Sequence, residues 1–392
     1  MTDTPLLLAG DFAAPTREQW EAEVLKVLNR RRPEGKELSI DQAMKRLRTV
    51  TVDGLTIEPL YTESADPLGL PGAMPFTRGA TVKSGEMSAW DVRALHEDPD
   101  VEFTHAQVVS DLERGATSVW LRVGADGIPV DQVGAVLAGV DPSLAPIAVS
   151  SSDDQVAAAK ALVSFFKDAG AAKARGNLGL DALALAAVSG AAPDLTPHAE
   201  WVQAVLAELP GVRALTVDVL PYDNAGAGDV DQLAFAIATG VAYLRDLEAA
   251  GVDAAAAFGQ IEFRVSASAD EFLTIARLRA LRRLWARIGE VSGVPADARG
   301  AVQHAVTSWR MVTRDDPWVN LLRGTIATFS AAVGGAEAIT CLPFDTAQGL
   351  PDEFSRRMAR NTQLIAAEES NVGRVNDPAG GSWYVENLTA DL

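Results

Sequence analysis

A few polar residues in this chain could do chemistry, and they lie in or just after short apolar runs. Asp218 falls within ALTVDVL (residues 214–220) and could act as a general base. His304, within AVQHAVTS (residues 301–308), is the one histidine of four in such a run, and its ring could exchange a proton. Both residues have structural alternatives, because a carboxylate can pair with an arginine and a buried imidazole is usually hydrogen-bonded.

Other kinds of site have little support. The serines at 150–152 follow an apolar run but have no neighbouring histidine, so no activated serine nucleophile is expected. The sequence contains no H-E-x-x-H motif and no close cluster of histidine and cysteine, so no metal site is expected. The arginine-rich segment from Arg277 to Ile288 is expected to be a packed helix whose charged groups pair with acids.

The elements that would position these residues alternate between apolar runs and amphipathic segments, which is typical of a parallel α/β fold. The expected strands are residues 118–123, 146–151, 173–179, 214–220, 260–268, 301–308, 338–344 and 372–377. The clearest expected helices are residues 153–168, 229–249, 270–291, 317–333 and 351–370. Eight strands with their helices over roughly 260 residues match the size of a (β/α)8 TIM barrel. A doubly wound open sheet is the alternative, but GADG after Val123 is too short for its glycine-rich phosphate loop.

The residues before the barrel are expected to form an extended N-terminal arm. A charged helical stretch begins at Thr16, with Gln19 completing a capping box, but it lacks the apolar stripe of a small domain. Residues 56–86 are rich in proline and glycine, and their apolar side chains favour contact with a partner surface. The expected organisation is an arm and partner-wrapping segment at 1–112, a barrel at 113–380 and the start of a linker at 381–392.

Composition and charge narrow the range of partners. The chain has 34 Lys and Arg against 53 Asp and Glu, a net charge of −19, so nucleic acid and anionic membranes would repel it. A single cysteine, Cys341, cannot form an intramolecular disulfide, and the N-terminus does not resemble a secretory signal. We therefore expect a cytoplasmic protein with no nucleic-acid or membrane partner.

Several strings carry a more specific signal. They are IEPLYT at 57–62, PGAMPFTRG at 71–79, RLRALRRLWARI at 277–288, RRMARNTQLIAAEES at 356–370 and NDPAGGSWYVENLT at 376–389. Together they resemble the barrel domain of the cobalamin-dependent acyl-CoA mutases, in particular methylmalonyl-CoA mutase, from about Glu58 to the C-terminus. The resemblance implies a TIM barrel that holds an acyl-CoA and an arm that wraps a partner subunit. It also implies a separate flavodoxin-like cobalamin domain further along, which is expected to be absent from this chain.

The residues that do chemistry in that family are largely replaced here. Active members read W-T-I-R-Q-Y where this chain reads WDVRAL at 90–95, so Leu95 stands in place of the tyrosine that packs over the substrate. The strip after PFTRG has no aromatic residue. The glutamine that the family's third strand supplies and the carboxylate-binding arginine soon after it are also missing, since no glutamine lies between Ala171 and Pro197 and no arginine between Arg175 and Arg213.

The family's tyrosine-histidine pair is missing as well. Its S-G-Y-H-M-Q-E-A-G corresponds to DVLPYDNAG here, which puts Leu220 and Pro221 at the pair, and neither side chain can donate a hydrogen bond. A shifted alignment could put Tyr222 in the place of the tyrosine, but the histidine would still be absent. His304 matches a family histidine, but the glutamine expected after it is Val306.

These replacements set the functional expectation. Each lost polar contact is worth about 1–3 kcal/mol when its partner is left buried, so losing several together leaves little affinity for an acyl-CoA. The resemblance implies a non-catalytic small subunit of a heterodimeric methylmalonyl-CoA mutase, which interconverts methylmalonyl-CoA and succinyl-CoA. The chain would bind no cofactor and have no catalytic residue, and its catalytic large subunit would hold adenosylcobalamin.

Two alternatives remain open. One is an autonomous acyl-CoA isomerase or lyase of altered specificity, which would need a polar, open barrel mouth. The other is an interaction protein related to the mutase chaperones, although the G-x-x-x-x-G-K-[ST] motif of those proteins does not occur here.

Overall fold

The structure is a computed structural model that describes residue 13 and residues 15–64, 68–83, 90–170 and 173–392. The chain divides into two compact units, Met1–Thr62 and Glu63–Leu392, and each is described by itself. Among the described residues, no helix has the length and apolar character needed to cross a membrane.

The first unit contains two helices, α1 (Arg17–Asn29) and α2 (Ile40–Leu47), and a short antiparallel pair, β1 (Thr49–Val50) and β2 (Thr56–Ile57). The expected capping box is confirmed: the Thr16 hydroxyl accepts the backbone N–H of Gln19, whose side chain accepts the backbone N–H of Thr16. Helix α1 buries none of its residues and α2 buries only Ala43 and Met44. The described part of this unit therefore has very little core of its own.

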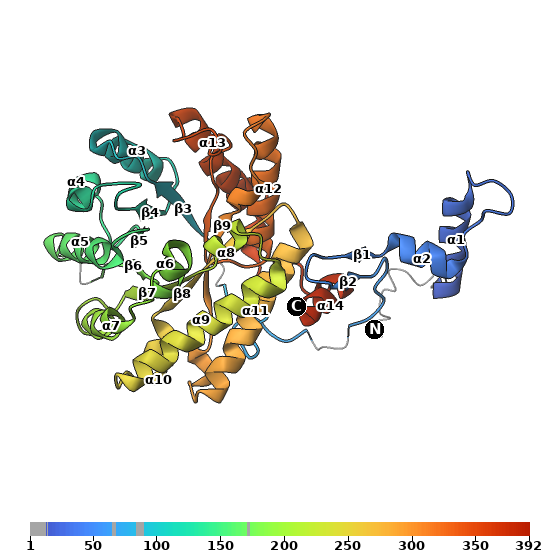
Figure 1. The fold of residues 1–392 in the computed structure, drawn as a ribbon, viewed down its shortest axis with the longest axis horizontal. Coiled ribbons are helices and arrows are strands. Elements are labelled where there is room, and N and C mark those ends of the chain that lie inside the picture. Colours follow the sequence, from blue (N-terminus) through green and yellow to red (C-terminus); the bar gives the residue numbers. More distant parts are fainter. Residues whose placement is uncertain (1–12, 14, 65–67, 84–89, 171–172) are drawn as a thin grey trace, which may run out of the picture. The chain divides into compact units, whose positions relative to one another are not determined.

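The second unit is a closed barrel of parallel strands, so the predicted TIM barrel is confirmed (Figure 1). The strands follow one another around the barrel in chain order, and β10 closes it by pairing with β3. Their bounds are β3 (Asp91–His96), β4 (Ser118–Arg122), β5 (Ile147–Ser150), β6 (Gly176–Leu180), β7 (Val212–Asp218), β8 (Ile261–Ala267), β9 (Val302–Thr307) and β10 (Ala338–Thr340).

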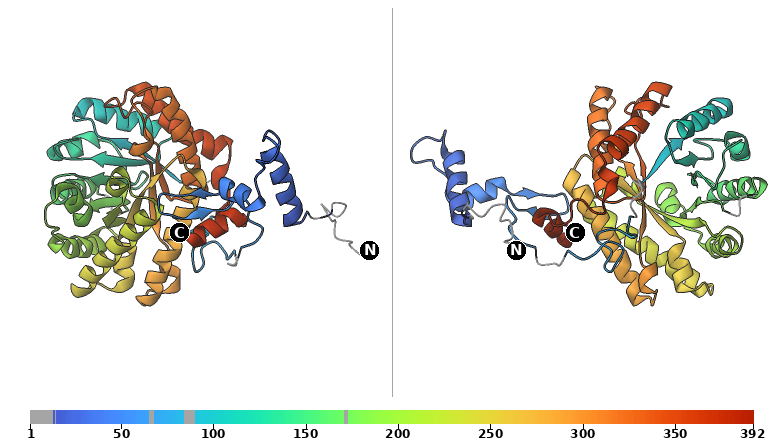
Figure 2. Two further views of the ribbon diagram at one scale, coloured as in Figure 1. Left: turned by 45° about the vertical axis from the view of Figure 1, so that its right-hand side comes forward. Right: turned by 180° about the vertical axis from the view of Figure 1, so that it is seen from behind.

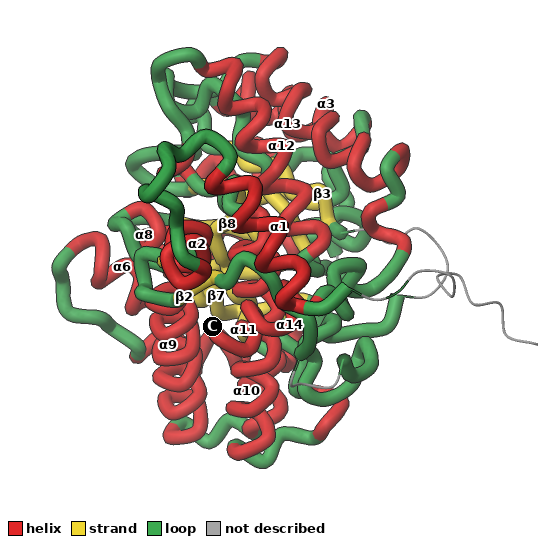
Figure 3. Tube along the Cα trace, turned by 90° about the vertical axis from the view of Figure 1, so that its right-hand side faces the viewer, coloured by secondary structure: helices red, strands yellow, loops and turns green. Residues whose placement is uncertain are grey.

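Helices surround the strands, as the two views of Figure 2 and the tube in Figure 3 show. They are α3 (Val101–Glu113), α4 (Val133–Val136), α5 (Gln155–Asp168), α6 (Ala182–Ser189), α7 (Thr196–Glu208), α8 (Leu220–Asn224), α9 (Asp229–Ala249), α10 (Ala254–Gly259), α11 (Glu271–Val291), α12 (Pro317–Val333), α13 (Glu353–Leu364) and α14 (Trp383–Asp391). Several begin at an aspartate just after a strand, as α5 does at Asp154 and α6 at Asp181, because its carboxylate accepts a free N–H of the first turn.

One expected strand is wrong, and the barrel begins earlier than residue 113. Residues 372–377 contain a 3-10 turn, Val372–Arg374, and β3 (Asp91–His96) supplies the remaining strand. The sequence of β3, DVRALH, has charged or ionisable residues at three of its six positions (Asp91, Arg93 and His96), so it does not read as an apolar strand. Arg93 is tolerated there because it pairs with an acid inside the barrel.

The last residues also differ from the expectation. The sequence predicts the start of a linker at residues 381–392, but most of these residues form α14, which packs on α11. Val385 and Leu388 of α14 are buried, and Glu386 makes an ion pair with Arg279 of α11. Helix α14 is therefore an integral part of the barrel unit.

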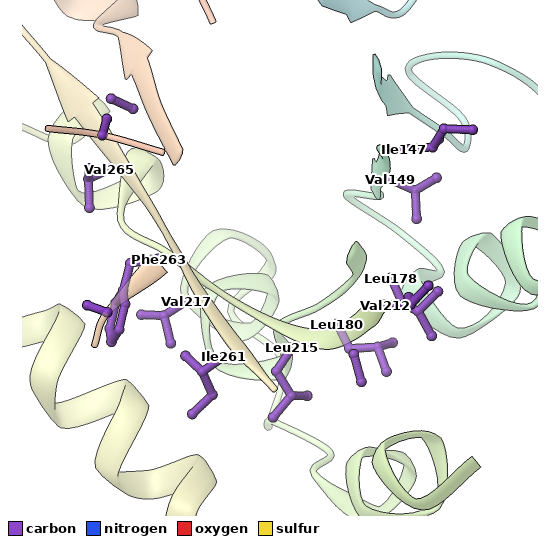
Figure 4. Close-up of a cluster of buried hydrophobic side chains, with 14 of the residues drawn as sticks. Ile147, Val149, Leu178, Leu180, Val212, Leu215, Val217, Ile261, Phe263 and Val265 are labelled. Atoms are coloured by element: carbon purple, nitrogen blue, oxygen red, sulfur yellow. The ribbon is translucent and has the colours of Figure 1, made fainter. Parts of the chain in front are cut away.

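The hydrophobic core lies between the strands and the helices, and β8 shows how the sequence divides its side chains between two environments. Successive side chains of a strand point to opposite faces. Ile261, Phe263 and Val265 belong to the large core cluster, part of which Figure 4 shows. Glu262 and Arg264 alternate with them, so they face the inside of the barrel. At β8 the barrel interior is therefore polar, whereas the surrounding core is apolar.

Candidate functional site

The interior of the barrel contains a layer of charged side chains from different strands. Arg93 of β3 donates from Nη1 to Glu262 Oε1 of β8 at 2.8 Å and from Nε to the hydroxyl of Ser118 at 3.0 Å. Arg264, also on β8, donates from Nη1 to Asp218 Oδ2 at 3.0 Å. Burial by itself would raise the pKa of Glu262, but the surrounding guanidinium groups, Arg93 first, hold it below its ordinary value. The layer is therefore a set of paired charges that fills the barrel axis.

His304, a candidate from the sequence, lies within this layer and is fully buried. Arg264 Nε donates to its Nδ1 at 3.4 Å, and its Nε2 lies 2.8 Å from the hydroxyl oxygen of Thr340. Since that hydroxyl donates to the Arg93 carbonyl, the Nε2 atom carries the hydrogen and donates to Thr340. Burial, together with Arg93 and Arg264, keeps the pKa of His304 well below its ordinary value, so the ring is neutral. All of its polar atoms are engaged in structural contacts.

Three of the replaced positions come together above this layer. Leu95, Leu220 and Val306 belong to one small cluster of buried side chains, to which Trp120 also contributes. Leu95 is the second-last residue of β3 and Val306 the second-last of β9, while Leu220 begins α8 directly after β7. We call these four side chains, with Ala148 and Leu342 of the same cluster, the apolar plug. It lies inside the barrel near the carboxyl ends of the strands, where TIM-barrel enzymes place their active sites.

A cavity of about 410 Å³ remains beside the plug. Trp120 and Leu220 form part of its wall, and Pro221, the fourth replaced position, lines it as well. Its polar lining includes Asp218, whose Oδ2 is paired with Arg264 and whose Oδ1 accepts the N–H of Leu220 at 3.0 Å. This candidate base is therefore held by structural hydrogen bonds, and the serine that lines the cavity at 150 accepts a bond from Trp120 Nε1.

A buried acid, Asp181, is the most perturbed group of this cavity. It accepts hydrogen bonds from the hydroxyl of Tyr243 and from the N–H groups of Asp218 at 2.6 Å and Ala184 at 3.0 Å. Burial raises the pKa of Asp181 to about 7 despite these bonds. No sequence motif distinguishes Asp181 from other helix-capping aspartates, because its burial depends on α9, which carries Tyr243.

Sequence patterns also failed to mark Glu262 and Arg264 as neighbours of His304. Their positions in QIEFRVSAS alternate with apolar residues, and that alternation is the only signal in the sequence that they face the barrel axis. Among the described residues, no group of three or more His, Cys, Asp or Glu side chains is placed to hold a metal ion.

Residues 122–392 match methylmalonyl-CoA mutase. The chain belongs to that family. It is 56% identical to the methylmalonyl-CoA mutase small subunit of Propionibacterium freudenreichii subsp. shermanii and 48% identical to that of Streptomyces virginiae, over 100% of its own length in both cases. It is also 29% identical to methylmalonyl-CoA mutase of Cereibacter sphaeroides over 87% of its length. The chain covers 62%, 64% and 53% of these relatives, respectively.

Membership of the methylmalonyl-CoA mutase family confirms the resemblance found in the sequence. Of the residues judged replaced by comparison with active members, Leu95, Leu220 and Val306 lie in the plug, and Pro221 lies on the wall of the adjoining cavity. The retained His304 lies in the charged layer. The five positions therefore lie in one region of the barrel, although they are far apart in the sequence.

Proposed function

We propose that this chain is a non-catalytic small subunit of a heterodimeric, adenosylcobalamin-dependent methylmalonyl-CoA mutase. That enzyme interconverts methylmalonyl-CoA and succinyl-CoA, and this chain would support the homologous catalytic large subunit. The observation that carries the proposal is the apolar plug, in which Leu95, Leu220 and Val306 pack together at the place where an active barrel needs polar groups.

The plug argues against substrate binding for energetic reasons. The thioester and carboxylate of an acyl-CoA must exchange water for protein donors, and a leucine or valine side chain offers none. An unpaired polar group costs about 1–3 kcal/mol on burial, so the missing contacts would cancel much of the binding energy. His304 cannot compensate, because it is fully buried and its two nitrogens already bond to Arg264 and Thr340.

The chain's histidines do not fit the role of axial ligand to cobalamin. His96, His198 and His304 are at most 2% exposed, and His105 directs Nδ1 to the carbonyl of Val136 at 3.1 Å on the side of the barrel. The cavity beside the plug has no histidine in its lining. We therefore place the adenosylcobalamin in the partner and derive no chemistry through it here.

The proposed partner is the catalytic large subunit, and the proposed compartment is the cytoplasm. The relatives that match over the whole chain are named small subunits, which supports a heterodimer. The net charge of −19 disfavours nucleic acid and anionic membranes as partners.

Size-exclusion chromatography of the chain with and without the large subunit, followed by a mutase assay of each fraction, tests the proposal. We expect a stable 1:1 complex, activity only in fractions that contain the large subunit and none for this chain alone. Turnover of methylmalonyl-CoA by the isolated chain with added adenosylcobalamin would contradict the non-catalytic role. Failure of the two chains to associate would contradict the proposed partner.

The cavity beside the plug is the one observation that favours the alternative, an autonomous acyl-CoA isomerase or lyase of altered specificity. It has a volume of about 410 Å³ and is lined by Asp181, Asp218 and Arg264. Isothermal titration of the isolated chain with a panel of acyl-CoA thioesters distinguishes the two functions. Binding that is lost on substituting Asp181→Ala, with conversion of the bound thioester, would support the alternative.

A further inference from the structure

Two arginines of the RRMARNTQLIAAEES string lie on α13 (Glu353–Leu364), which packs against β3 and α3 (Figure 1). Arg356 Nη2 donates to Asp111 Oδ2 of α3 at 2.7 Å, and Arg360 Nη1 donates to Oδ1 of the same carboxylate. The two arginine side chains are only 9% and 8% exposed. They belong to neither the apolar plug nor the charged layer. Two buried guanidinium groups therefore share one carboxylate.

Both guanidinium groups have buried donors without an acceptor. Among the described residues, the Nε atoms of Arg356 and Arg360 have no hydrogen-bond partner. Arg356 uses its two terminal nitrogens on the Leu95 carbonyl, on His96 Nδ1 and on Asp111. A guanidinium carries five N–H donors, and buried donors are nearly always satisfied by protein, water or an ion. The two Nε atoms therefore point to a bound species that supplies an acceptor.

A small cavity of about 30 Å³ lies beside these side chains. Arg356 and Arg360 line it, together with Asp111, Cys341 and Gln363. A cavity needs about 10–15 Å³ to hold one water molecule, so this cavity has room for about one or two species of that size. Sulfate, phosphate and organic carboxylates each have several heavy atoms and are too large. The cavity therefore selects water or a monatomic ion.

The charge around this cavity is positive. Among the described residues that line it, Asp111 is the one ionised acid, because burial raises the pKa of the Cys341 thiol to about 11 and keeps it protonated. Burial, and then the charge of Arg356, hold the pKa of the neighbouring His96 well below its ordinary value, so that ring is neutral. Two guanidinium groups against one carboxylate leave one positive charge in excess.

The other carboxylates of the surrounding segments do not offset this charge. Among the described residues, the ion pairs of Arg356 and Arg360 go to Asp111 alone, and Glu97, just after β3, is paired with Arg122. Three partly buried acids of these segments make no ion pair with either arginine: Asp91, Asp98 and Asp345. The exposed acids are Asp100, Glu102, Glu113, Asp352, Glu353, Glu368 and Glu369. Charges in contact with water are strongly screened, so the excess charge at the cavity stays uncompensated.

We propose that the cavity between α13 and β3 binds one chloride ion, held by the Nε–H groups of Arg356 and Arg360. A water molecule would supply an acceptor only, whereas chloride also neutralises the excess charge, and an uncompensated buried charge is strongly destabilising. The net charge of −19 is screened beyond about 8 Å at physiological salt, so the local positive charge decides. Bound chloride would help to hold α13 against β3. The inference does not depend on the proposed function.

Urea unfolding in sodium chloride and in sodium gluconate at equal ionic strength tests the site in solution. Gluconate is too large for the cavity, while both salts screen the net charge of the chain equally. A ligand that binds only the folded state raises the folded-to-unfolded ratio by one plus its concentration divided by Kd. Chloride at ten times its Kd should therefore raise that ratio about elevenfold over gluconate.

Arg360→Met and a matched control variant show whether the chloride effect arises at this site. Arg360→Met removes one Nε–H and the excess charge, and it leaves Asp111 paired with Arg356. The control is Arg357→Met, which removes the same charge from an exposed position of the same helix. We expect wild type and Arg357→Met to show the full chloride effect and Arg360→Met to lose most of it.

Crystals grown in sodium bromide test the position of the ion and decide the case if Arg360→Met does not fold. Bromide replaces chloride and scatters X-rays anomalously, so we expect an anomalous peak between Arg356 and Arg360. Equal stability of wild type in the two salts, or a chloride effect that Arg360→Met keeps in full, would overturn the inference. Density without an anomalous peak would show water and overturn it as well. A peak without any chloride effect in solution would mean binding at crystal concentration only, with the same consequence.

Discussion

The guanidinium carbon of Arg264 lies 4.3 Å from the centroid of the Trp120 ring, inside the barrel. Both side chains are buried, and such a cation–π contact is worth about 2 kcal/mol or more when it is desolvated. Trp120 is also part of the apolar plug, while Arg264 belongs to the charged layer below it. His304 meets the same indole edge-on, with 5.3 Å between ring centroids. One tryptophan therefore joins the plug to the charged layer, and the two form a single packed unit.

Loss of Arg264 should strongly destabilise the chain. Arg264→Met leaves Asp218 without its cation and removes the hydrogen bond to His304. Breaking a buried pair in this way costs about 3–5 kcal/mol, which urea unfolding followed by circular dichroism would measure. The control is Arg287→Met, which removes a surface ion pair with Glu290 and should cost less than about 1 kcal/mol. Equal stability of the two variants would show that the Arg264 contacts do not hold the barrel together.

Asp181 should make stability depend on pH. Burial raises its folded-state pKa to about 7, whereas the ordinary value is 3.8. At pH values between 3.8 and about 7, the Asp181 carboxyl group is protonated in the folded chain but largely ionised in the unfolded chain. The contribution of Asp181 to the free energy of unfolding therefore falls as pH rises from about 4 to about 7. Asp181→Asn keeps a helix-capping side chain but removes the titration. We therefore expect wild type to lose stability relative to this variant over that range.

The measurement for Asp181 is urea unfolding of both proteins at pH 4, 5, 6 and 7. The difference in stability between the two proteins cancels the pH-dependent contributions that they share. One of these comes from Glu337, because burial raises the pKa of its carboxyl group to about 7 as well. Another comes from His198, because burial lowers the pKa of its ring to about 4, and its contribution to stability rises with pH instead of falling. A difference that stays constant with pH would mean that Asp181 keeps its ordinary pKa in the folded chain.

Much of the fold follows from the sequence because its strands and helices have clear patterns. Seven of the eight expected strands are present, and the expected bounds of α9 and α12 agree with the structure. The missed strand, β3, carries Arg93 and His96, and its place in the barrel depends on contacts with Glu262 on β8 and Asp111 on α3. Such long-range pairs have no local signal in the sequence.

The site was predictable only in part, for a similar reason. Comparison with active mutases identified Leu95, Leu220 and Val306 as replacements one at a time, but only the barrel geometry places them in one cluster. The pattern of Asp218 suggested a general base or an arginine pair, and the structure supports the pair because Arg264 lies 3.0 Å away. Arg264 could not have been chosen in advance from among the many arginines of the chain.

Arg279 should be essential for attaching α14 to the barrel unit. It is fully buried on α11 and donates to Asp377 Oδ1 at 2.9 Å, to Glu386 Oε1 at 2.6 Å and to the hydroxyl of Thr389 at 2.7 Å. Its pairing also confirms the expectation that the arginine-rich helix would bind acids. Arg279→Met leaves two carboxylates without this cation, so we expect a loss of about 3–5 kcal/mol.

Hydrogen exchange would show whether the effect of Arg279→Met spreads along the chain. Amides of residues 383–391 should exchange faster in the variant than in wild type, because α14 loses its attachment to α11. Amides of β4 and β5, on another part of the barrel, serve as the internal control and should change less. Unchanged protection of α14 would indicate that Val385 and Leu388 are sufficient to hold the helix.

His304 should be dispensable for turnover by the complex but not for the stability of this chain. His304→Gln replaces the ring with a neutral amide that can still bond to Arg264 or to Thr340, so we expect a destabilisation of about 1–2 kcal/mol. Because the ring is buried and neutral and both of its nitrogens are engaged in hydrogen bonds within the barrel, it is not available to exchange a proton with a substrate. The mutase activity of the complex between the variant and the large subunit should therefore stay within about twofold of that of the wild-type complex. The assay is run at a concentration and temperature at which size-exclusion chromatography shows that both complexes are intact. A loss of tenfold or more in kcat by an intact complex would mean that His304 acts in catalysis, and the proposal that this barrel is non-catalytic would then be wrong.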